Sequence, residues 1–482
     1  MTTPRRRTLS ILGLSLFAAA SLATSSAHAE VFVYNCVLSP IQENPVVTGS
    51  RAFGAGRFVI DTDANTASYR IVYSRLLGTE SAAHIHGSVT SSPGTNAGVL
   101  VALPAGNPKV GVWNFTEAQQ SLLLNGLCYA NVHSTAFPGG ELRGQIVPLN
   151  ATLDGAQETP AVSTNGRGFA TFTVDTAANV LSYYVRYDGL NSPESAAHIH
   201  GNALHGTPAG VKVALPAGSP KVGTWNYAEA DEEALLAGRM YVNIHTGTSP
   251  GGEIRGQICP VVVPMDALQE VPPTSATGSS GFALVSIDTS AAAHKLSYDV
   301  HIDSLSGTEL AAHIHGFSAA GANAGVQNAL VVGARKIGTW TYGALNEANV
   351  LAGLTYFNSH TAANGGGEIR GQLLDLPHAA SVLGVGGGAQ RIVSGLAAAP
   401  NPFGIRTVLS FQLSRTGSVS MSIVGVDGRS VRRIPAALFA PGAHAYEWDG
   451  RTDDGSAAAP GVYFAVVRTP DGEKVTRLAR LR

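Results

Sequence analysis

Three short strings of this chain carry paired histidines at the spacing expected of a metal-binding strand. Each string reads Ala-Ala-His-Ile-His-Gly, and one further histidine follows later in each unit. Side chains two residues apart on a strand project from the same face, so the imidazoles point one way and the isoleucine the other. Three neutral imidazoles suit copper(II) or zinc and leave a coordination position open. The candidate metal ligands are His84, His86 and His133; His198, His200 and His245; and His313, His315 and His360.

A second interpretation of these residues needs no metal. The histidines, with nearby Asn, Glu and Arg, would form a hydrogen-bonded surface network that braces the sheet, and both interpretations stay open here. A Gly-Gly-Glu-Leu/Ile-Arg-Gly-Gln string follows each third histidine, and its Glu and Arg share one strand face. That arrangement is more typical of a solvent-exposed ion pair than of an arginine that faces an anion and attracts it to the site. The pairs are Glu141 and Arg143, Glu253 and Arg255, and Glu368 and Arg370.

Other side chains near the strings also receive an expected role. A glutamate lies four residues before each first histidine and would orient an imidazole from behind. These glutamates are Glu80, Glu194 and Glu309. A tryptophan recurs at one position of each unit, and we expect it in the core. The tryptophans are Trp113, Trp225 and Trp340.

The elements that position these residues are predicted to be strands. Phe169 to Val174 and Leu181 to Tyr187 are β-rich runs on either side of a hairpin signal. If the aliphatic side chains face the core, the histidines lie on the outer sheet surface or in a cleft over it. One short helix is expected at Ala230 to Ala237, because Asn226 to Glu229 resembles a capping box and Gly238 can end the helix in a left-handed conformation.

The strings recur in three copies of a domain-sized unit. Lys-x-Gly-x-Trp and an opening Gln-Glu pair recur with them. A repeat of this length is a folded module rather than one turn of a solenoid. A segment rich in Ala, Gly, Val and Ser follows and is expected to be a linker. The last part alternates like strands, with Asp-Gly turns at residues 427–428 and 454–455. The predicted domains are residues 30–148, 149–261, 262–376 and 399–482, with a linker at 377–398.

Composition limits the classes of function. Charged residues make up only 13% of the 482 residues, and the net charge of -2 provides no basic footprint for nucleic acid. Hydrophobic residues make up 44%, enough to bury cores and to exclude a largely disordered chain. Three cysteines exclude a disulfide framework. Cys36 and Cys128 fall in the same unit, as a disulfide or as two buried thiols, and the sequence does not decide between them.

The N-terminus is predicted to be a secretory signal peptide, residues 1–29. Arg5 to Arg7 form its basic region, Ile11 to Leu22 its apolar core, and Ala27-His28-Ala29 its cleavage site. Arg6-Arg7-Thr8-Leu9 also half-matches a twin-arginine signal, so the general and the twin-arginine export routes both stay open. We expect an exported protein, secreted or on the outer cell surface, with the periplasm as an alternative. No apolar stretch beyond the signal is long enough for a membrane span.

The strings AAHIHG and GGEIRGQ, one of each per unit, resemble the CHRD domain, the module named after chordin. The resemblance covers residues 30 to about 376. It implies compact extracellular β-sandwiches without an assigned biochemical activity. A fainter resemblance is to copper-zinc superoxide dismutase, in which an H-x-H strand and a later strand histidine bind copper. Between Gly87 and Pro108 the first unit has no histidine or aspartate, and the second unit offers only His205 in the corresponding segment. The bridging histidine and the zinc cluster of that family therefore have no counterpart here.

The last segment is similar to FlgD-type immunoglobulin-like domains and to C-terminal sorting domains of type IX secretion. Pro400 to Phe403, Val426 to Arg429, Trp448 to Gly450 and Gly461 to Phe464 carry this resemblance. It implies passage across an outer membrane, with removal or surface attachment left open. An ordinary terminal β-sandwich is the alternative.

These observations predict an all-β protein with three tandem antiparallel Greek-key-type β-sandwich domains and a C-terminal immunoglobulin-like β-sandwich. The first functional hypothesis is a non-catalytic, modular binding or structural protein with an extracellular or cell-surface partner. The alternative is a copper- or zinc-binding protein with sites like those of superoxide dismutase. A hydrolase has little support, because the chain has no nucleophile elbow and no H-E-x-x-H motif.

Overall fold

A computed structural model describes residues 31–90, 92–176, 178–276, 278–290, 293–373, 393–413, 417–425, 430–440, 442–469 and 472–481. The predicted signal peptide, most of the predicted linker and the turn at residues 427–428 lie outside these ranges. Among the described residues, no helix has the length and hydropathy needed to cross a membrane.

Repeat 1 is a sandwich of two four-stranded antiparallel sheets. The strand order is β1-β2-β3-β6 in one sheet and β5-β4-β7-β8 in the other, so the chain crosses between the sheets three times in Greek-key fashion. Its elements are β1 (Val31–Leu38), η1 (Pro40–Gln42), β2 (Phe53–Asp61), β3 (Thr66–Ser74), β4 (Glu80–Gly87), β5 (Val99–Ala102), β6 (Lys109–Asn114), α1 (Glu117–Leu124), β7 (Cys128–Ser134) and β8 (Leu142–Gln145).

Repeats 2 and 3 repeat this topology, and in each a single bridge joins the two sheets into one eight-stranded sheet. Repeat 2 contains β9 (Leu149–Asp154), η2 (Gly155–Gln157), β10 (Arg167–Asp175), β11 (Val180–Asp188), β12 (Glu194–Gly201), β13 (Val211–Ala214), β14 (Lys221–Asn226), α2 (Glu229–Leu236), β15 (Met240–Thr246) and β16 (Ile254–Gln257). Repeat 3 contains β17 (Val261–Asp266), η3 (Ala267–Gln269), β18 (Ser280–Asp288), β19 (Lys295–Asp303), β20 (Glu309–Gly316), β21 (Val326–Leu330), β22 (Arg335–Thr341), η4 (Ala344–Asn346), α3 (Glu347–Leu351), β23 (Thr355–Thr361) and β24 (Ile369–Leu373).

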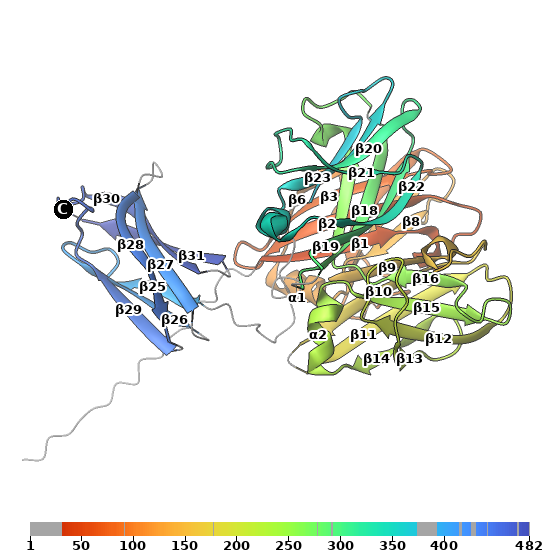
Figure 1. Cartoon of the computed structure of the whole chain (residues 1–482), viewed down its shortest axis with the longest axis horizontal. Helices are drawn as coiled ribbons and strands as arrows, with labels where there is room; N and C mark the ends of the chain where they lie inside the picture. The colour runs from red at the N-terminus through yellow and green to blue at the C-terminus, as the bar shows by residue number, and fades with distance from the viewer. Residues whose placement is uncertain are drawn as a thin grey trace, which may run out of the picture.

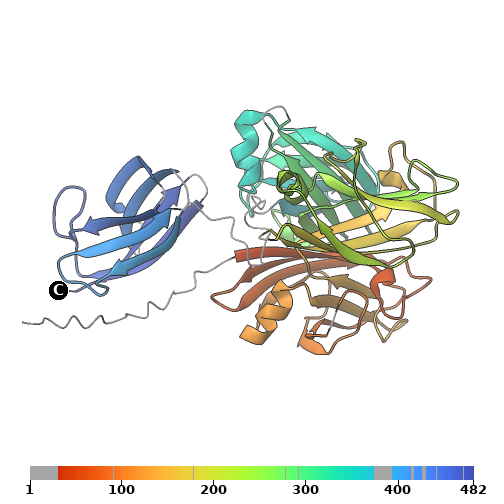
Figure 2. The same cartoon turned by 90° about the horizontal axis from the view of Figure 1, so that it is seen from below.

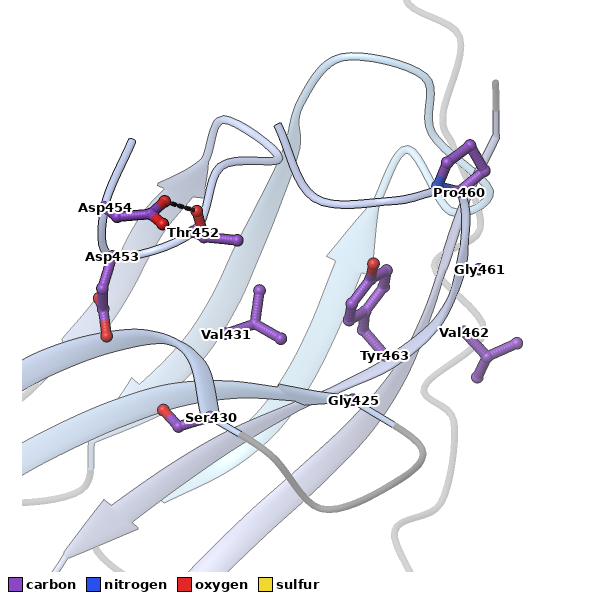
Figure 3. Close-up of a pocket in the computed structure, with 10 residues that line it drawn as sticks. All are labelled: Gly425, Ser430, Val431, Thr452, Asp453, Asp454, Pro460, Gly461, Val462 and Tyr463. Atoms are coloured by element: carbon purple, nitrogen blue, oxygen red, sulfur yellow. Dashed lines mark hydrogen bonds between the residues drawn. The ribbon is translucent and has the colours of Figure 1, made fainter. Parts of the chain in front are cut away.

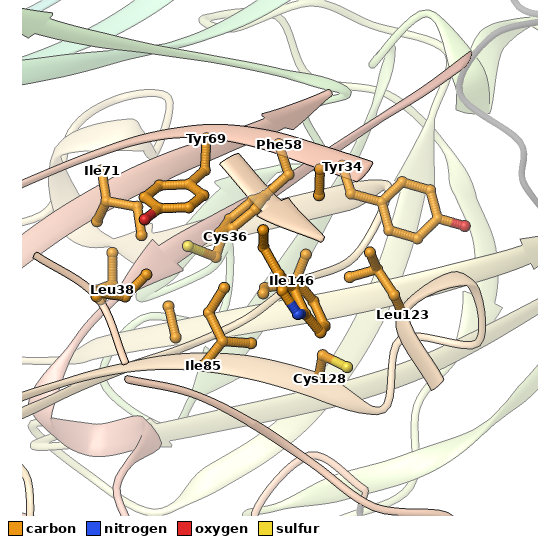
Figure 4. Close-up of a cluster of buried hydrophobic side chains, with 14 of the residues drawn as sticks. Tyr34, Cys36, Leu38, Phe58, Tyr69, Ile71, Ile85, Leu123, Cys128 and Ile146 are labelled. Atoms are coloured by element: carbon orange, nitrogen blue, oxygen red, sulfur yellow. The ribbon is translucent and has the colours of Figure 1, made fainter. Parts of the chain in front are cut away.

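The core of each repeat lies between its two sheets. In repeat 1, Phe58 and Ile71 from one sheet meet Ile85 from the other (Figure 4). The recurring tryptophans are buried in these cores, as predicted. Cys36 and Cys128 are buried with free thiols, so the structure supports the second of the two alternatives for this pair.

The predicted hairpin and helix of repeat 2 are both present, but the helix begins differently from the prediction. Strands β10 and β11 pair in register from Arg167 to Asp175. Asn226 ends strand β14 and does not cap α2; Ala228 is the N-cap residue and has no side-chain cap. Gly238 adopts φ +77° directly after the helix end, as expected for a left-handed terminating residue.

The three repeats pack into one body in which each contacts the other two (Figures 1 and 2). Ile41 of repeat 1 packs on Phe169 and Tyr184 of repeat 2. Between repeats 2 and 3, Arg335 pairs with Asp154 at 2.7 Å. The ring closes between repeats 3 and 1, where Asp266 pairs with Arg70 at 2.7 Å and apolar residues from both repeats form a shared cluster. The tandem units therefore form a closed ring rather than an extended string.

The C-terminal segment forms a separate sandwich of a three-stranded and a four-stranded sheet (Figure 1). Trp448 lies at its centre against Phe403 and Tyr463, with ring centroids 5.4 Å from each. The strands are β25 (Val393–Ala399), β26 (Thr407–Leu413), β27 (Gly417–Gly425), β28 (Ser430–Phe439), β29 (Gly442–Trp448), β30 (Gly461–Thr469) and β31 (Gly472–Arg480). The predicted linker is therefore too long: β25 begins inside it and pairs with β26.

Candidate metal centre

The structure brings the three histidines of each repeat together. His84 and His86 stand on β4 and His133 stands on β7, its antiparallel neighbour. Ile85 is buried in the core, so the imidazoles lie on the outer face of the sheet, as the alternation predicted. In every repeat one nitrogen from each of the three rings lies within 4.8 Å of the others. The same arrangement is formed on β12 and β15 by His198, His200 and His245, and on β20 and β23 by His313, His315 and His360.

Backbone carbonyls hold two of the three rings. His86 Nδ1 donates to the Ala97 carbonyl at 3.0 Å, and His133 Nδ1 donates to the Pro138 carbonyl at 2.9 Å. A neutral ring with its proton on Nδ1 presents a free lone pair on Nε2. His86 Nε2 is buried and has no hydrogen-bond partner, and the same atom is unpartnered in His200 and His315. Each repeat thus contains a buried imidazole nitrogen whose lone pair accepts no hydrogen bond from the protein.

The third nitrogen comes from the first histidine. His84 Nδ1 lies 3.2 Å from His133 Nε2. The residues therefore fit a transition metal with the donor set His84 Nδ1, His86 Nε2 and His133 Nε2, two of them oriented by carbonyls in the way that protein metal ligands usually are.

Burial favours the neutral, metal-binding form of at least one imidazole in each pair on β4, β12 and β20. Desolvation lowers the pKa of His84, and the neighbouring His133 lowers it further. The pKa of His86 is also lowered, first by burial and then by the two other rings and Arg143, while the Ala97 carbonyl opposes the change. The pKa of His200 and of His315 is lowered in the same direction and mainly by the same cause.

A tyrosine and an arginine support the second histidine. The rings of His86 and Tyr129 stack in parallel, with centroids 4.9 Å apart and planes inclined by 2°. The Arg143 guanidinium lies 3.6 Å from the centre of the Tyr129 ring. Ala97 joins the group, because its N–H donates to the Tyr129 hydroxyl while its carbonyl accepts from His86. The equivalent stacks are His200, Tyr241 and Arg255, and His315, Tyr356 and Arg370.

The prediction of a solvated Glu–Arg ion pair is wrong. Glu141 and Arg143 are both buried and have different partners. Glu141 accepts hydrogen bonds from Ser50, Ser134 and the Leu77 backbone N–H. Glu253 and Glu368 likewise accept from neighbouring hydroxyls and backbone N–H groups, and Arg255 and Arg370 lie buried on their tyrosines. Loops cover this outer face, which strand alternation alone does not reveal, and no arginine of the three faces an anion in solvent.

The glutamates before the histidine pairs do not orient imidazoles either. Glu80 binds Lys109 and accepts from the Tyr73 hydroxyl at 2.5 Å. Lys109 is fully buried and also donates to the carbonyls of Pro104 and Gly106. Glu194 binds Lys221 and Glu309 binds Lys336 in the same way. These glutamates anchor a buried lysine because the edge strand β6 brings that lysine against the start of β4.

The extra histidine of repeat 2 lies away from the metal ligands. His205 is buried where repeat 2 meets repeat 3, and neither ring nitrogen has a hydrogen-bond partner. Burial lowers its pKa to about 4; Arg255, Arg335 and His301 act in the same direction and Asp299 opposes them. His205 thus contributes to a contact between repeats and not to the three-histidine group.

Two recurring residues of the site were not predicted. Tyr129 stacks on a histidine, and the only sequence signal was that a tyrosine recurs four residues before each third histidine. Glu43 lies buried beside Asn131 on the same outer face. It belongs to the Gln-Glu pair that opens each unit, so its recurrence was visible while its position was not.

A cavity of about 620 Å³ lies in the C-terminal sandwich (Figure 3). The chain itself satisfies its carboxylates: Asp453 accepts from the Arg433 N–H, and Asp454 accepts from the Thr452 hydroxyl and the Ser456 N–H. The lining residues are Gly425, Ser430, Val431, Thr452, Asp453, Asp454, Pro460, Gly461, Val462 and Tyr463.

Two curated relatives are similar to parts of this chain. Chordin of Danio rerio is 27% identical over 269 residues, which cover 50% of this chain and 28% of chordin. Chordin of Xenopus laevis is 30% identical over 171 residues, which cover 31% of this chain and 18% of that protein. The chain thus spans less than a third of the length of these curated relatives.

Similarity to solved structures is weak. Dimeric latent PorU from Porphyromonas gingivalis matches 70% of this chain and 34% of its own at 9% identity and a TM-score of 0.17. PorZ, a surface component of the type IX secretion system of the same organism, matches 90% of this chain and 69% of its own at 11% identity and a TM-score of 0.14. These scores are too low to indicate a shared fold.

Family models match most of the chain. The CHRD domain model matches residues 34–146, 149–258 and 261–373, which are the three repeats of the ring. The FlgD Ig-like domain model matches residues 404–473 of the C-terminal sandwich. The chain therefore belongs to the CHRD domain family, with three tandem copies followed by a FlgD Ig-like domain.

Proposed function

We propose that this chain is an exported, modular binding protein in which each CHRD repeat holds one copper or zinc ion through three histidines. One observation carries the proposal: in all three repeats the second histidine has a buried Nε2 without a hydrogen-bond partner, and one nitrogen of its ring lies within 4.8 Å of a nitrogen of each of two further imidazoles. An unpartnered buried polar atom costs about 1–3 kcal/mol, and a metal ion would remove that cost three times over.

The chemistry of the donors favours copper over zinc at equal availability. All three ligands are neutral imidazoles, and divalent copper binds such nitrogen sites more tightly than zinc does. Three protein ligands leave room for water or an exogenous ligand at the ion. We propose metal binding as the function, with redox catalysis at the bound ion as the alternative.

The proposed setting is outside the cytoplasm. The signal-like N-terminus, the relationship to chordin and the FlgD Ig-like domain support export to the cell surface or the medium. We further propose that the C-terminal domain directs type IX secretion and that the ring binds an extracellular or cell-surface partner. Three sites in one rigid ring would add avidity toward a repetitive partner.

The experiment measures metal bound to the full mature chain by mass spectrometry. We expect three ions per chain, and two after His84, His86 and His133 are all changed to Ala. The control His444→Ala alters a half-buried histidine of the C-terminal sandwich, far along the chain from the three histidine groups, and should leave three ions bound. If the triple variant still binds as many ions per chain as the wild type, the proposed site is refuted. A superoxide assay on the copper-loaded protein tests the alternative of redox catalysis.

A further inference from the structure

Each repeat buries a second polar group that the metal ligands do not explain. Glu43, Glu158 and Glu270 follow directly after η1, η2 and η3 and are almost fully buried. One carboxyl oxygen of Glu43 accepts from Asn131 Nδ2 at 3.4 Å, and Glu270 accepts from Asn358 at the same distance. The other oxygen, Oε1, has no partner in any repeat. The facing asparagine oxygens, Oδ1 of Asn131, Asn243 and Asn358, have none either.

The unpartnered oxygens gather at one point in each repeat. A Cβ atom placed on Gly140 would lie 2.7 Å from both Glu43 Oε1 and Asn131 Oδ1. On Gly252 it would lie 2.5 Å and 2.3 Å from the matching atoms of Glu158 and Asn243. Two buried acceptors side by side cannot satisfy each other. A proton on the glutamate turns one of them into a donor and satisfies both.

Burial of these carboxyls favours a bound proton, although an arginine lies near each of them. Burial raises the pKa of Glu43 to about 7, against the opposing charge of Arg143. Burial also raises the pKa of Glu158 and of Glu270 to about 7. Arg255 and Arg370 oppose the shift in these two repeats, while Asp154 and Asp266 add to it.

The glutamate and asparagine pack against the turn that orients the third metal ligand. Gly140 ends that turn at φ +128°, and its N–H donates to the Phe137 carbonyl at 3.0 Å. The Pro138 carbonyl of the same turn holds His133 Nδ1. In repeat 2 the turn ends at Gly252 and uses the Pro250 carbonyl to hold His245; in repeat 3 it ends at Gly367 and uses the Gly365 carbonyl to hold His360.

We propose that Glu43, Glu158 and Glu270 are positioning residues that carry a proton and donate it in a hydrogen bond to the neighbouring asparagine oxygen, so that the turn holding the third histidine keeps its metal-binding shape. The link to metal affinity rests on the function proposed above. The protonation itself does not, because it is a property of the metal-free protein.

Repeat 3 supplies a matched control. Glu368 is also a buried glutamate, but its carboxylate accepts from Ser279, Thr361 and Ser306. These donors lower its pKa to about 2, against the opposing effect of burial. Its surroundings are built for an ionised carboxylate, whereas those of Glu270 leave an acceptor facing an acceptor.

The test uses the full mature chain with all three positioning glutamates changed together, to Gln in one variant and to Ala in another. Gln keeps the shape and supplies an N–H donor in place of the proposed O–H. We expect copper affinity within about threefold of wild type for the Gln variant and a loss of about 10–100-fold for the Ala variant. Equal losses in the two variants would overturn the positioning role.

Protonation is read out separately by infrared difference spectroscopy of the metal-free protein at about pH 5.5, wild type against the Gln variant. We expect the carbonyl band of a protonated carboxylic acid in the wild type, and its absence would overturn the proposal. Glu368→Gln should remove only a carboxylate band and should lower the denaturation midpoint. If no variant binds copper, the proposed function fails while the infrared result still decides the protonation.

Discussion

His84 Nδ1 lies 3.2 Å from His133 Nε2, and the equivalent atoms are 3.1 Å apart in each of the other two repeats. Because His133 Nδ1 donates to the Pro138 carbonyl, its Nε2 is an acceptor, and without metal the proton between the rings belongs to His84. A metal held by His84 Nδ1 would require the proton of this ring to reside on His84 Nε2, so that the imidazole stays neutral. The bracing network and the metal site are therefore two states of the same residues.

Metal should stabilise the fold by binding to these histidines. At a free copper concentration about one hundred times the dissociation constant, each occupied site adds about 2.7 kcal/mol to the free energy of unfolding. We expect the urea midpoint to rise with copper and to fall back with a chelator. His133→Ala should remove one third of the bound copper, and a midpoint unchanged by copper in the wild type would contradict linkage between binding and folding.

The stacked tyrosine should matter for affinity through its ring more than through its hydroxyl. Tyr241→Leu removes the face on which His200 and Arg255 pack, and we expect about 10–100-fold weaker copper binding at repeat 2. Tyr241→Phe keeps the ring and loses only the hydrogen bonds of the hydroxyl with the Ala209 backbone, which it accepts from the N–H and donates to the carbonyl. Titration calorimetry should find Phe much closer to wild type than Leu; equal effects would assign the role to the hydroxyl.

The contact between repeats 2 and 3 should depend on Arg335. Its guanidinium binds Asp299 of its own repeat and Asp154 of repeat 2, both at 2.7 Å. Arg335→Ala removes the arginine from the buried Asp299 and leaves it only His301, whose Nε2 lies 3.2 Å from Asp299 Oδ1, and we expect a loss of about 3–5 kcal/mol in urea denaturation. The comparison variant, Arg406→Ala, breaks an exposed ion pair and should cost less than about 1 kcal/mol. Similar losses for the two variants would show that the buried ion pair of Arg335 contributes no more to stability than the exposed one.

Acid should weaken the same contact through His205. The pKa of His205 is about 4 in the folded protein against an ordinary value of 6.5, so the unfolded chain takes up the proton first as pH falls. The contribution of the neutral His205 to the free energy of unfolding is therefore fully present above about pH 6.5. It declines by about 3 kcal/mol as the pH falls to about 4. His205→Leu should flatten this part of the profile measured by urea denaturation. A wild type and a variant with parallel profiles would contradict the assignment.

Much of the architecture was accessible from the amino-acid sequence. Recurrence of AAHIHG and GGEIRGQ predicted three equal modules, and alternation along each strand placed Ile85 inward and His84 and His86 outward. These predictions hold because a strand has a period of two and each module must bury one face of each sheet. The three histidines of a unit also proved to be neighbours, although only the topology demonstrates that β4 pairs with β7.

The partners of the polar residues were decided by tertiary structure alone. Alternation distinguishes an inward from an outward side chain, but it does not show that a loop covers the outer face, and such loops bury Arg143 and Glu141 apart from each other. Likewise, His205 acquires its surroundings from Asp299 and Arg335, residues of another repeat that lie far along the chain. The sequence by itself determined the modules and the face on which the histidines lie. Packing between loops and repeats decided which charges are buried and which nitrogen atoms remain free for a metal, because those contacts depend on surfaces that no local pattern records.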